Sequence, residues 1–250
     1  MLKLEDISVS VPGDNGPFEI IENVSLTLDE KKIYVMTGPN GGGKSSLAKA
    51  IMGIYPLTGG KILLDGEDIS ELSITERAKR GIGYAFQSPT RFKGITVGDF
   101  LQLASGGEKG QNSCDSCELL INVGLCAQDY LGRELNASLS GGELKRVEIA
   151  SILARDLKVA LFDEPEAGID LWSFQKLTET FRELNKRLNT TIIIISHQER
   201  ILRLADEVIM VANGKVSEIT SRDKILEEIG VLDSSYVCPI DCSATGGKPC

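Results

Sequence analysis

Apolar and polar residues alternate along the first part of the chain. From Met1 to about Leu28 the pattern has a period of two, and a Pro-Gly-Asp-Asn-Gly-Pro sequence at residues 12–17 interrupts it. Alternation of this kind is typical of strands with one buried face, and the interrupting sequence is typical of a turn. The sequence therefore predicts antiparallel strands in this region.

Two later apolar runs, at residues 159–162 and 192–195, are continuous instead of alternating. Continuous runs are expected for strands that are covered on both faces of a parallel sheet. Helical patterns follow from Lys44 to about Met52 and from Leu171 to Leu188. This order predicts an α/β fold with a mixed, mostly parallel sheet, an antiparallel edge and right-handed crossovers.

The composition changes between Thr96 and Leu139, where Gly, Ser, Asn and Cys are frequent and helical stretches fall near residues 97–104 and 117–123. We interpret this region as part of a helical insert, about residues 90–155, in a domain that covers residues 1–230. From about Val231 the periodicity is lost. Residues 231–250 are therefore expected to form a flexible tail that contains cysteine.

Composition narrows the possible partners. The chain has 250 residues and a net charge of −9, so it is large enough for an ample core and lacks the basic character of a general nucleic-acid or anionic-membrane binder. It contains no run of 18 apolar residues and no signal-peptide pattern, and its six cysteines are too sparse for a disulfide scaffold. We expect a cytoplasmic protein with reduced thiols that neither enters a membrane nor binds nucleic acid.

A glycine-rich sequence lies between the apolar run at residues 33–36 and the first predicted helix. It reads Gly38-Pro39-Asn40-Gly41-Gly42-Gly43-Lys44-Ser45 and fits the P-loop pattern G-x4-G-K-[ST]. In this motif backbone N–H groups hold phosphates, the lysine reaches the terminal phosphates and the hydroxyl ligates Mg²⁺. The strand–loop–helix context supports the match, and Ser46 completes the predicted ATP-binding set.

Two carboxylates and the single histidine follow the continuous apolar runs. Asp163 stands where a P-loop protein needs a carboxylate for Mg²⁺, and the adjacent Glu164 is the candidate general base that orients the attacking water. The alternative for Glu164 is an acid in a turn. His197 comes directly after the second run, at the strand end where open α/β sheets bind ligands. Lys44, Glu164 and His197 are therefore the predicted catalytic residues.

A second glycine-rich sequence, Leu139-Ser140-Gly141-Gly142-Glu143, precedes a helical pattern in which Leu144, Val147, Ala150 and Ala154 recur at three- and four-residue steps. A similar copy at Ser105-Gly106-Gly107-Glu108 runs instead into a loop-like sequence, and we interpret it as a linker. The N-terminus of a helix suits anionic phosphate. The later copy resembles the signature of the ABC (ATP-binding cassette) ATPases.

The resemblance covers roughly residues 1–220, and it implies a P-loop NTPase fold with an ABC-type ATPase core and a helical subdomain. It implies that Ser140, Gly141, Gly142 and Glu143 contact the ATP held by the P-loop of a second copy, and that His197 contacts the γ-phosphate. Gln87 resembles the Q-loop glutamine, which ligates Mg²⁺ with Ser45 and Asp163.

Two further positions follow from the same resemblance. Asp170 occupies the D-loop position, where the two subunits signal to each other, and it also suits the N-cap of the helix that begins at Leu171. At the position where the family has an aromatic residue that stacks on adenine, this chain has Val11. Phe18 is the alternative residue for stacking on adenine.

Several local sequences are most similar to the SufC-like ATPase subunit of the SUF iron–sulfur cluster assembly machinery. They are residues 74–78, 92–95 and 141–148 and the Gly-Ile-Asp form of the D-loop. The resemblance implies an Mg-dependent ATPase that dimerises with ATP and drives a SufB/SufD-like scaffold. The alternatives are the ATPase subunit of a membrane transporter and a nucleotide-dependent binding module.

The tail cysteines could serve cluster or iron handling, for which thiolate is the natural ligand. The spacing of Cys238, Cys242 and Cys250 is not that of a regular zinc site. The alternative is a disordered tail with reduced thiols.

Overall fold

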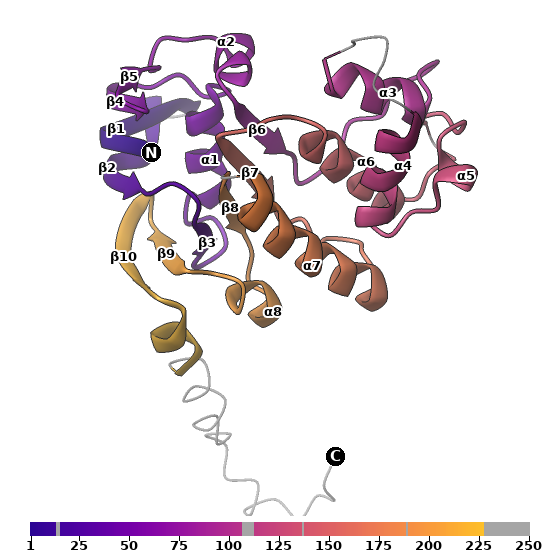
Figure 1. The fold of residues 1–250 in the computed structure, drawn as a ribbon. Helices are drawn as coiled ribbons and strands as arrows, with labels where there is room; N and C mark the ends of the chain where they lie inside the picture. Colours follow the sequence, from indigo (N-terminus) through magenta and orange to yellow (C-terminus); the bar gives the residue numbers. More distant parts are fainter. Residues whose placement is uncertain (14–15, 107–112, 137, 189, 228–250) are drawn as a thin grey trace, which may run out of the picture.

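The computed structural model describes residues 1–13, 16–106, 113–136, 138–188 and 190–227, arranged as two sheets with helices between and beside them (Figure 1). The predictions for Cys238, Cys242, Cys250 and the tail at 231–250 lie outside these residues.

One of the two sheets is antiparallel and contains both strands of the predicted N-terminal pair. Its order is β2-β1-β4-β5, with β1 at Leu2–Gly13, β2 at Gly16–Leu28, β4 at Gly59–Leu64 and β5 at Glu67–Asp68. The pairing of β1 with β2 confirms the prediction from the alternating pattern. These strands form a sheet of their own instead of extending the parallel one.

The second sheet carries the strands predicted from the continuous apolar runs. Its order is β10-β9-β3-β8-β7-β6. The strands are β3 at Ile33–Thr37, β6 at Ile82–Ala85, β7 at Val159–Asp163, β8 at Thr191–Ile195, β9 at Glu207–Ala212 and β10 at Lys215–Ser221. Pairing is parallel from β9 to β6, and β10 is antiparallel to β9. The carboxyl ends of the parallel strands therefore share one edge.

Helix α1, at Lys44–Met52, lies between the two sheets. Its buried residues, including Leu47 and Ile51, join one apolar cluster with residues of both sheets. The other face of the parallel sheet packs on α6, at Gly141–Leu153, and α7, at Leu171–Leu188, in a second cluster. The resulting layers hold the start of α1 at the carboxyl edge of the parallel sheet.

The helical part of the molecule consists of α3 to α6 and stands to one side of the sheets (Figure 1). It adds α3 at Val97–Ala104, α4 at Ser113–Asn122 and α5 at Ala127–Tyr130 to α6. The helix expected near residues 97–104 is α3, whereas α4 begins earlier than the expected 117–123. The remaining helices are α2 at Ile74–Lys79 and α8 at Glu199–Leu202, and residues 222–227 are also helical.

A buried arginine of α2 caps the C-terminus of α1. Arg77 is 2% exposed, and its guanidinium donates to the carbonyls of Ala50 and Ile51 at 2.8 and 2.9 Å. It also donates to the carbonyls of Ser70 and Leu72 at 2.6 and 3.1 Å. The last carbonyls of a helix have no partner within the helix, so this side chain satisfies groups that would otherwise be buried without hydrogen bonds.

We expect Arg77→Met to lower the free energy of unfolding by about 3 kcal/mol, because it leaves these carbonyls without donors. Arg80→Met is the matched control, since Arg80 is on the surface and pairs with Glu67, and it should change stability little. Urea denaturation of both variants measures the difference. Equal, small effects would contradict the role given to Arg77.

Candidate active site

The P-loop leaves the end of β3 and turns into α1 beside β9. Gly38 has φ 131°, and a Cβ atom there would lie 2.2 Å from the carbonyl oxygen of Val211. Only glycine fits both the conformation and the space. The loop is therefore held against the backbone of β9.

Lys44 opens α1 and bends back over this loop. Lys44 is 6% exposed, and its Nζ donates to the carbonyls of Gly38 and Pro39 at 2.8 and 2.9 Å. Burial lowers the pKa of Lys44, while the nearby Asp163 and Glu164 oppose that shift. A desolvated cation beside free N–H groups at a helix start is suited to bind phosphate.

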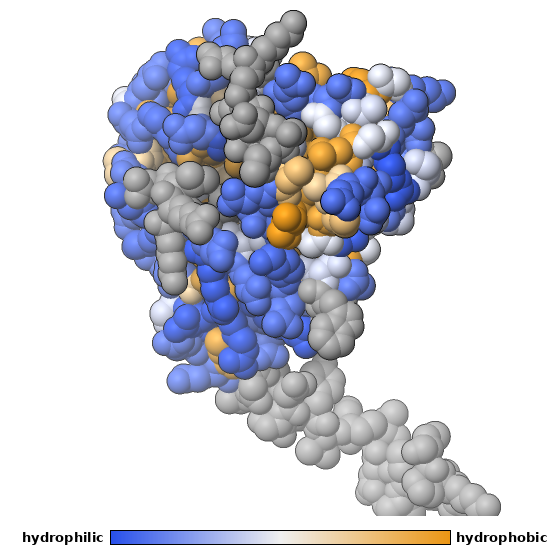
Figure 2. All heavy atoms as spheres, turned by 45° about the vertical axis from the view of Figure 1, so that its right-hand side comes forward, coloured by the Kyte–Doolittle hydropathy of each residue, from blue (hydrophilic) through white to orange (hydrophobic). Residues whose placement is uncertain are grey.

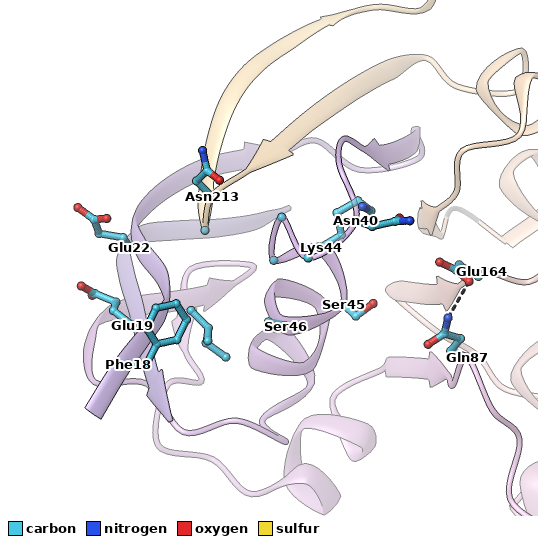
Figure 3. A pocket seen from close by; sticks show the side chains of 15 residues that line it. Phe18, Glu19, Glu22, Asn40, Lys44, Ser45, Ser46, Gln87, Glu164 and Asn213 are labelled. Atoms are coloured by element: carbon cyan, nitrogen blue, oxygen red, sulfur yellow. Dashed lines mark hydrogen bonds between the residues drawn. The ribbon is translucent and has the colours of Figure 1, made fainter. Parts of the chain in front are cut away.

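The loop forms one wall of a pocket of about 810 Å³, large enough for a nucleotide. Figure 3 shows the start of α1 in the middle of this pocket, with Phe18 on one side and Gln87 and Glu164 on the other. The lining residues are Phe18, Glu19, Ile20, Glu22, Asn40, Gly41, Gly42, Gly43, Lys44, Ser45, Ser46, Gln87, Glu164, Asn213 and Gly214. Most of the predicted ATP-binding residues thus meet in one place.

Asp163 joins three parts of the site. It is 1% exposed at the end of β7, and its carboxylate accepts hydrogen bonds from Ser45 Oγ at 3.0 Å and from the Tyr84 hydroxyl at 2.8 Å. Its backbone carbonyl accepts from Lys145 Nζ at 3.0 Å. The predicted carboxylate and hydroxyl ligands of Mg²⁺ are therefore adjacent.

Glu164 and Gln87 contact each other across the pocket. Gln87 Nε2 donates to Glu164 Oε2 at 2.7 Å (Figure 3). Glu164 has φ 44°, a left-handed conformation that is strained for a residue other than glycine, and its backbone N–H donates to the carbonyl of Ile195 at 3.0 Å. Strained residues of this kind cluster at functional sites.

His197 lies at the same edge, after β8. Its Nδ1 is 3.5 Å from Thr37 Oγ1, so the histidine stands beside the last residue of β3. Burial, together with the nearby Lys44, lowers the pKa of His197. The lowered pKa favours the neutral imidazole, which keeps one N–H for donation.

The signature sequence forms a capped helix start, as expected. Ser140 Oγ accepts from the N–H of Glu143 at 3.2 Å, and Glu143 Oε2 accepts from the N–H of Ser140 at 2.7 Å, which makes a capping box for α6. The Tyr130 hydroxyl and the Ser140 N–H, both donating to Glu143, lower the pKa of Glu143 to about 2. In the similar copy, Ser105 ends α3, and Gly107 and Glu108 lie outside the described residues.

The signature does not meet the P-loop within one chain. Residues 140–143, all of which the structure describes, do not line the P-loop pocket, and Ser140 and Gly141 are exposed. Gly142 instead packs on the D-loop, where a Cβ would lie 2.3 Å from the carbonyl oxygen of Gly168. Asp170 accepts from the N–H of Ser173 at 3.0 Å and so caps α7.

Several contributors to the site were missed at the sequence level, including Tyr84, the β9–β10 turn and Lys145. Asn213 and Gly214 form the turn between β9 and β10, and Gly214 N–H donates to the carbonyl of Gly42 at 2.9 Å. The Asn-Gly pair is a recognisable hairpin signal, but it gives no hint of the distant P-loop. Lys145 is 1% exposed in α6 and donates to the carbonyls of Phe86, Gln87 and Asp163. The burial of Lys145 could not be predicted, because the residue stands beside the apolar positions of the helix pattern.

The donors present fit a hard cation. The Ser45 hydroxyl, the Asp163 carboxylate and the Gln87 carboxamide supply oxygen atoms, which Mg²⁺ prefers, and a few protein ligands suffice because Mg²⁺ retains waters and phosphate oxygens. No group of three or more His, Cys, Asp or Glu side chains within the described ranges could hold a metal.

The family model described as ABC transporter matches residues 21–167, more than half of the chain. The chain belongs to the ABC transporter ATPase family. It is 40% identical over 223 residues to an uncharacterized ABC transporter ATP-binding protein of Methanocaldococcus jannaschii, covering 86% of this chain and 87% of that protein. It is 31% identical to vegetative protein 296 of Bacillus subtilis, covering 94% and 96%.

Solved structures confirm the fold class of this ABC ATPase. A dimeric post-hydrolysis ATP-binding cassette, MJ0796 bound to ADP and Pi, matches with a TM-score of 0.80 and 23% identity over 89% of this chain and 99% of that one. An ATPase of this family binds ATP with Mg²⁺ and hydrolyses it. No helix in the part of the chain that the structure describes has the length and apolar character to span a bilayer.

Proposed function

We propose that two copies of this ABC ATPase close head-to-tail around two ATP molecules and that closure moves a bound partner. One observation carries the proposal: Ser140, Gly141 and Gly142 lie on a capped, exposed helix start away from the P-loop pocket of their own chain. An exposed helix N-terminus with a capping serine suits the γ-phosphate held by a second copy. ATP-driven closure is then a shift of population toward the dimer.

In this proposal the P-loop and Lys44 hold the phosphates. Lys44 Nζ exchanges its two carbonyl partners for phosphate oxygens, which are better acceptors for a cation. Ser45, Asp163 and Gln87 would hold Mg²⁺, which neutralises charge that develops on the phosphates. Phe18 faces the same pocket, is 64% exposed and lies opposite Val11 in the β1–β2 pair, so we assign adenine stacking to it.

Glu164 acts as the general base in the closed dimer, where it orients the attacking water. Its carboxylate is bound to Gln87 in the isolated chain, so Gln87 must leave it as it turns toward the metal. The neutral imidazole of His197 donates a hydrogen bond to the γ-phosphate. Asp170 and Gly168 contact α7 and the signature helix start, and in this proposal the D-loop reports closure to both.

The variant Glu164→Gln should bind ATP and accumulate as a closed dimer, because it keeps the size of the side chain and removes the base. Lys44→Ala should lose ATP binding and remain monomeric. Size-exclusion chromatography with light scattering, with Mg²⁺ and ATP, measures both, and turnover should fall at least a hundredfold in each. A monomeric Glu164→Gln, or a Lys44→Ala with wild-type turnover, would refute the mechanism.

Two partners are supported by different observations. Relatives named as transporter ATP-binding proteins favour a membrane permease subunit. The local resemblance at residues 74–78, 92–95 and 141–148 favours a SUF-type scaffold in the cytoplasm. Beside the D-loop, Glu166 Oε1 accepts a hydrogen bond from Ser196, next to His197.

Cross-linking of the tagged chain in native cells, followed by mass spectrometry, separates these partners. An integral membrane protein would support transport, and a soluble scaffold would support cluster assembly. The same capture with Lys44→Ala tests whether ATP binding changes the association. We expect the wild type to capture one dominant partner. If neither the wild type nor Lys44→Ala captures a partner, the result would contradict a partner-driving function.

A further inference from the structure

A partly buried carboxyl group lies between the segments that carry Glu164 and His197. On the face drawn in Figure 2, hydrophilic side chains cover most of the surface, as is usual for charged residues. Glu166 departs from this pattern, because its Oε2 atom is buried and has no hydrogen-bond partner among the described residues. A buried carboxyl oxygen without a donor is costly, so stability alone does not account for this side chain.

The other oxygen of Glu166 is bonded to the residue before His197. Glu166 Oε1 accepts a hydrogen bond from the hydroxyl of Ser196, which is fully buried directly after β8. Ser196 Oγ in turn accepts from the backbone N–H of Gln198 at 3.0 Å. His197 stands between Ser196 and Gln198, so this hydroxyl bridges the backbone turn that carries the imidazole.

The carboxyl group sets the direction of these two hydrogen bonds. A serine hydroxyl has one proton and two lone pairs, so donation to Glu166 leaves a lone pair for the N–H of Gln198. If Glu166 is replaced by an apolar residue, the Ser196 proton loses its acceptor in a buried place. The hydroxyl then turns toward other acceptors, and the turn around His197 loses the contact that holds it.

The hydrogen bond from Ser196 does not require a charged Glu166. Burial raises the pKa of Glu166, and Glu164 adds to that shift, whereas Ser196, the residue's own N–H and Lys145 oppose it. A proton taken up on Oε2 leaves Oε1 free to accept from Ser196. An amide oxygen at this place should therefore serve as well as a carboxylate oxygen.

Glu166 also belongs to the segment that links the general base to the D-loop. The N–H of Glu164 donates to the carbonyl of Ile195 at 3.0 Å, so the ends of β7 and β8 are already joined by one backbone hydrogen bond. The carbonyl of Glu166 accepts from the N–H of Ile169 in the D-loop at 3.1 Å. Its side chain thus connects this segment to the residue that precedes His197.

We propose that Glu166 is a positioning residue for His197, which acts through Ser196 to hold the turn that directs the imidazole toward the γ-phosphate. This inference rests on the proposed function, because the contact of His197 with the γ-phosphate is part of it. Glu166 is among the described residues and does not line the P-loop pocket. Its replacement should therefore slow hydrolysis without weakening ATP binding.

Three variants of the full chain test the path by steady-state kinetics. Glu166→Leu removes the acceptor, Ser196→Ala removes the hydroxyl, and Glu166→Gln keeps an acceptor oxygen. We expect the first two to lower kcat about tenfold with a change in KM for ATP below about twofold, and Glu166→Gln to keep at least about a third of the wild-type kcat. The double variant with leucine and alanine should be no slower than the slower single variant, because both changes interrupt one path.

The imidazole itself provides a readout that needs no turnover. His197 is the single histidine of the chain, so its ring signals in an untagged, isotope-labelled protein are assigned without ambiguity. A proton–nitrogen correlation spectrum reports which ring nitrogen carries the proton. Without nucleotide, we expect Glu166→Gln to keep the wild-type ring signals and Glu166→Leu and Ser196→Ala to shift them.

Glu183→Leu is the matched control, because it makes the same change at an exposed position of α7 and should leave kcat and the ring signals unchanged. Wild-type kcat or unshifted ring signals in Glu166→Leu, or a Glu166→Gln that is as slow as Glu166→Leu, overturns the proposal. If thermal unfolding shows that Glu166→Leu is not folded, Ser196→Ala decides by the same criteria. Unshifted ring signals leave the dimer mechanism intact, whereas a monomeric Glu164→Gln would refute that mechanism whatever the Glu166 variants do.

Discussion

The side chain and carbonyl of Asp163 hold the active site together. The carboxylate accepts hydrogen bonds from Ser45 of the P-loop helix and Tyr84 of β6, and the carbonyl accepts from Lys145 of the signature helix. These elements are far apart in the sequence and meet because β7 lies between β8 and β6 in the parallel sheet. Asp163 is 1% exposed, so each of its polar atoms needs a hydrogen-bond partner within the protein. These hydrogen bonds fix the geometry of the segments around it.

In our proposal, the same constraint makes one chain incomplete as a catalyst. Lys145 fixes the signature helix to the strand end, and the capping box directs its N-terminus outward. The signature cannot turn back into the pocket of its own P-loop without breaking these contacts. In our account the missing phosphate contacts come from a second copy, and the Gln87–Glu164 hydrogen bond is exchanged when that copy arrives.

Local rules predicted those parts of the structure whose signals are local. The continuous apolar runs placed β7 and β8, and the helical periodicity after Ser140 distinguished the signature from the copy at Ser105. Contacts between distant segments were beyond such rules. The position of Asn213 and Gly214 against the P-loop depends on strand order, and the burial of Lys145 depends on carbonyls of two other elements.

The most direct test of the account is the Mg²⁺ dependence of ATP binding in Asp163→Asn. Asparagine keeps the shape of the side chain and can still accept from Ser45 or Tyr84, but it lacks the charge that Mg²⁺ requires. Calorimetric titration of ATP with and without Mg²⁺ should show that Mg²⁺ strengthens binding to the wild type. The account predicts that Asp163→Asn loses this gain and keeps its metal-free affinity. An unchanged gain from Mg²⁺ in Asp163→Asn would contradict it.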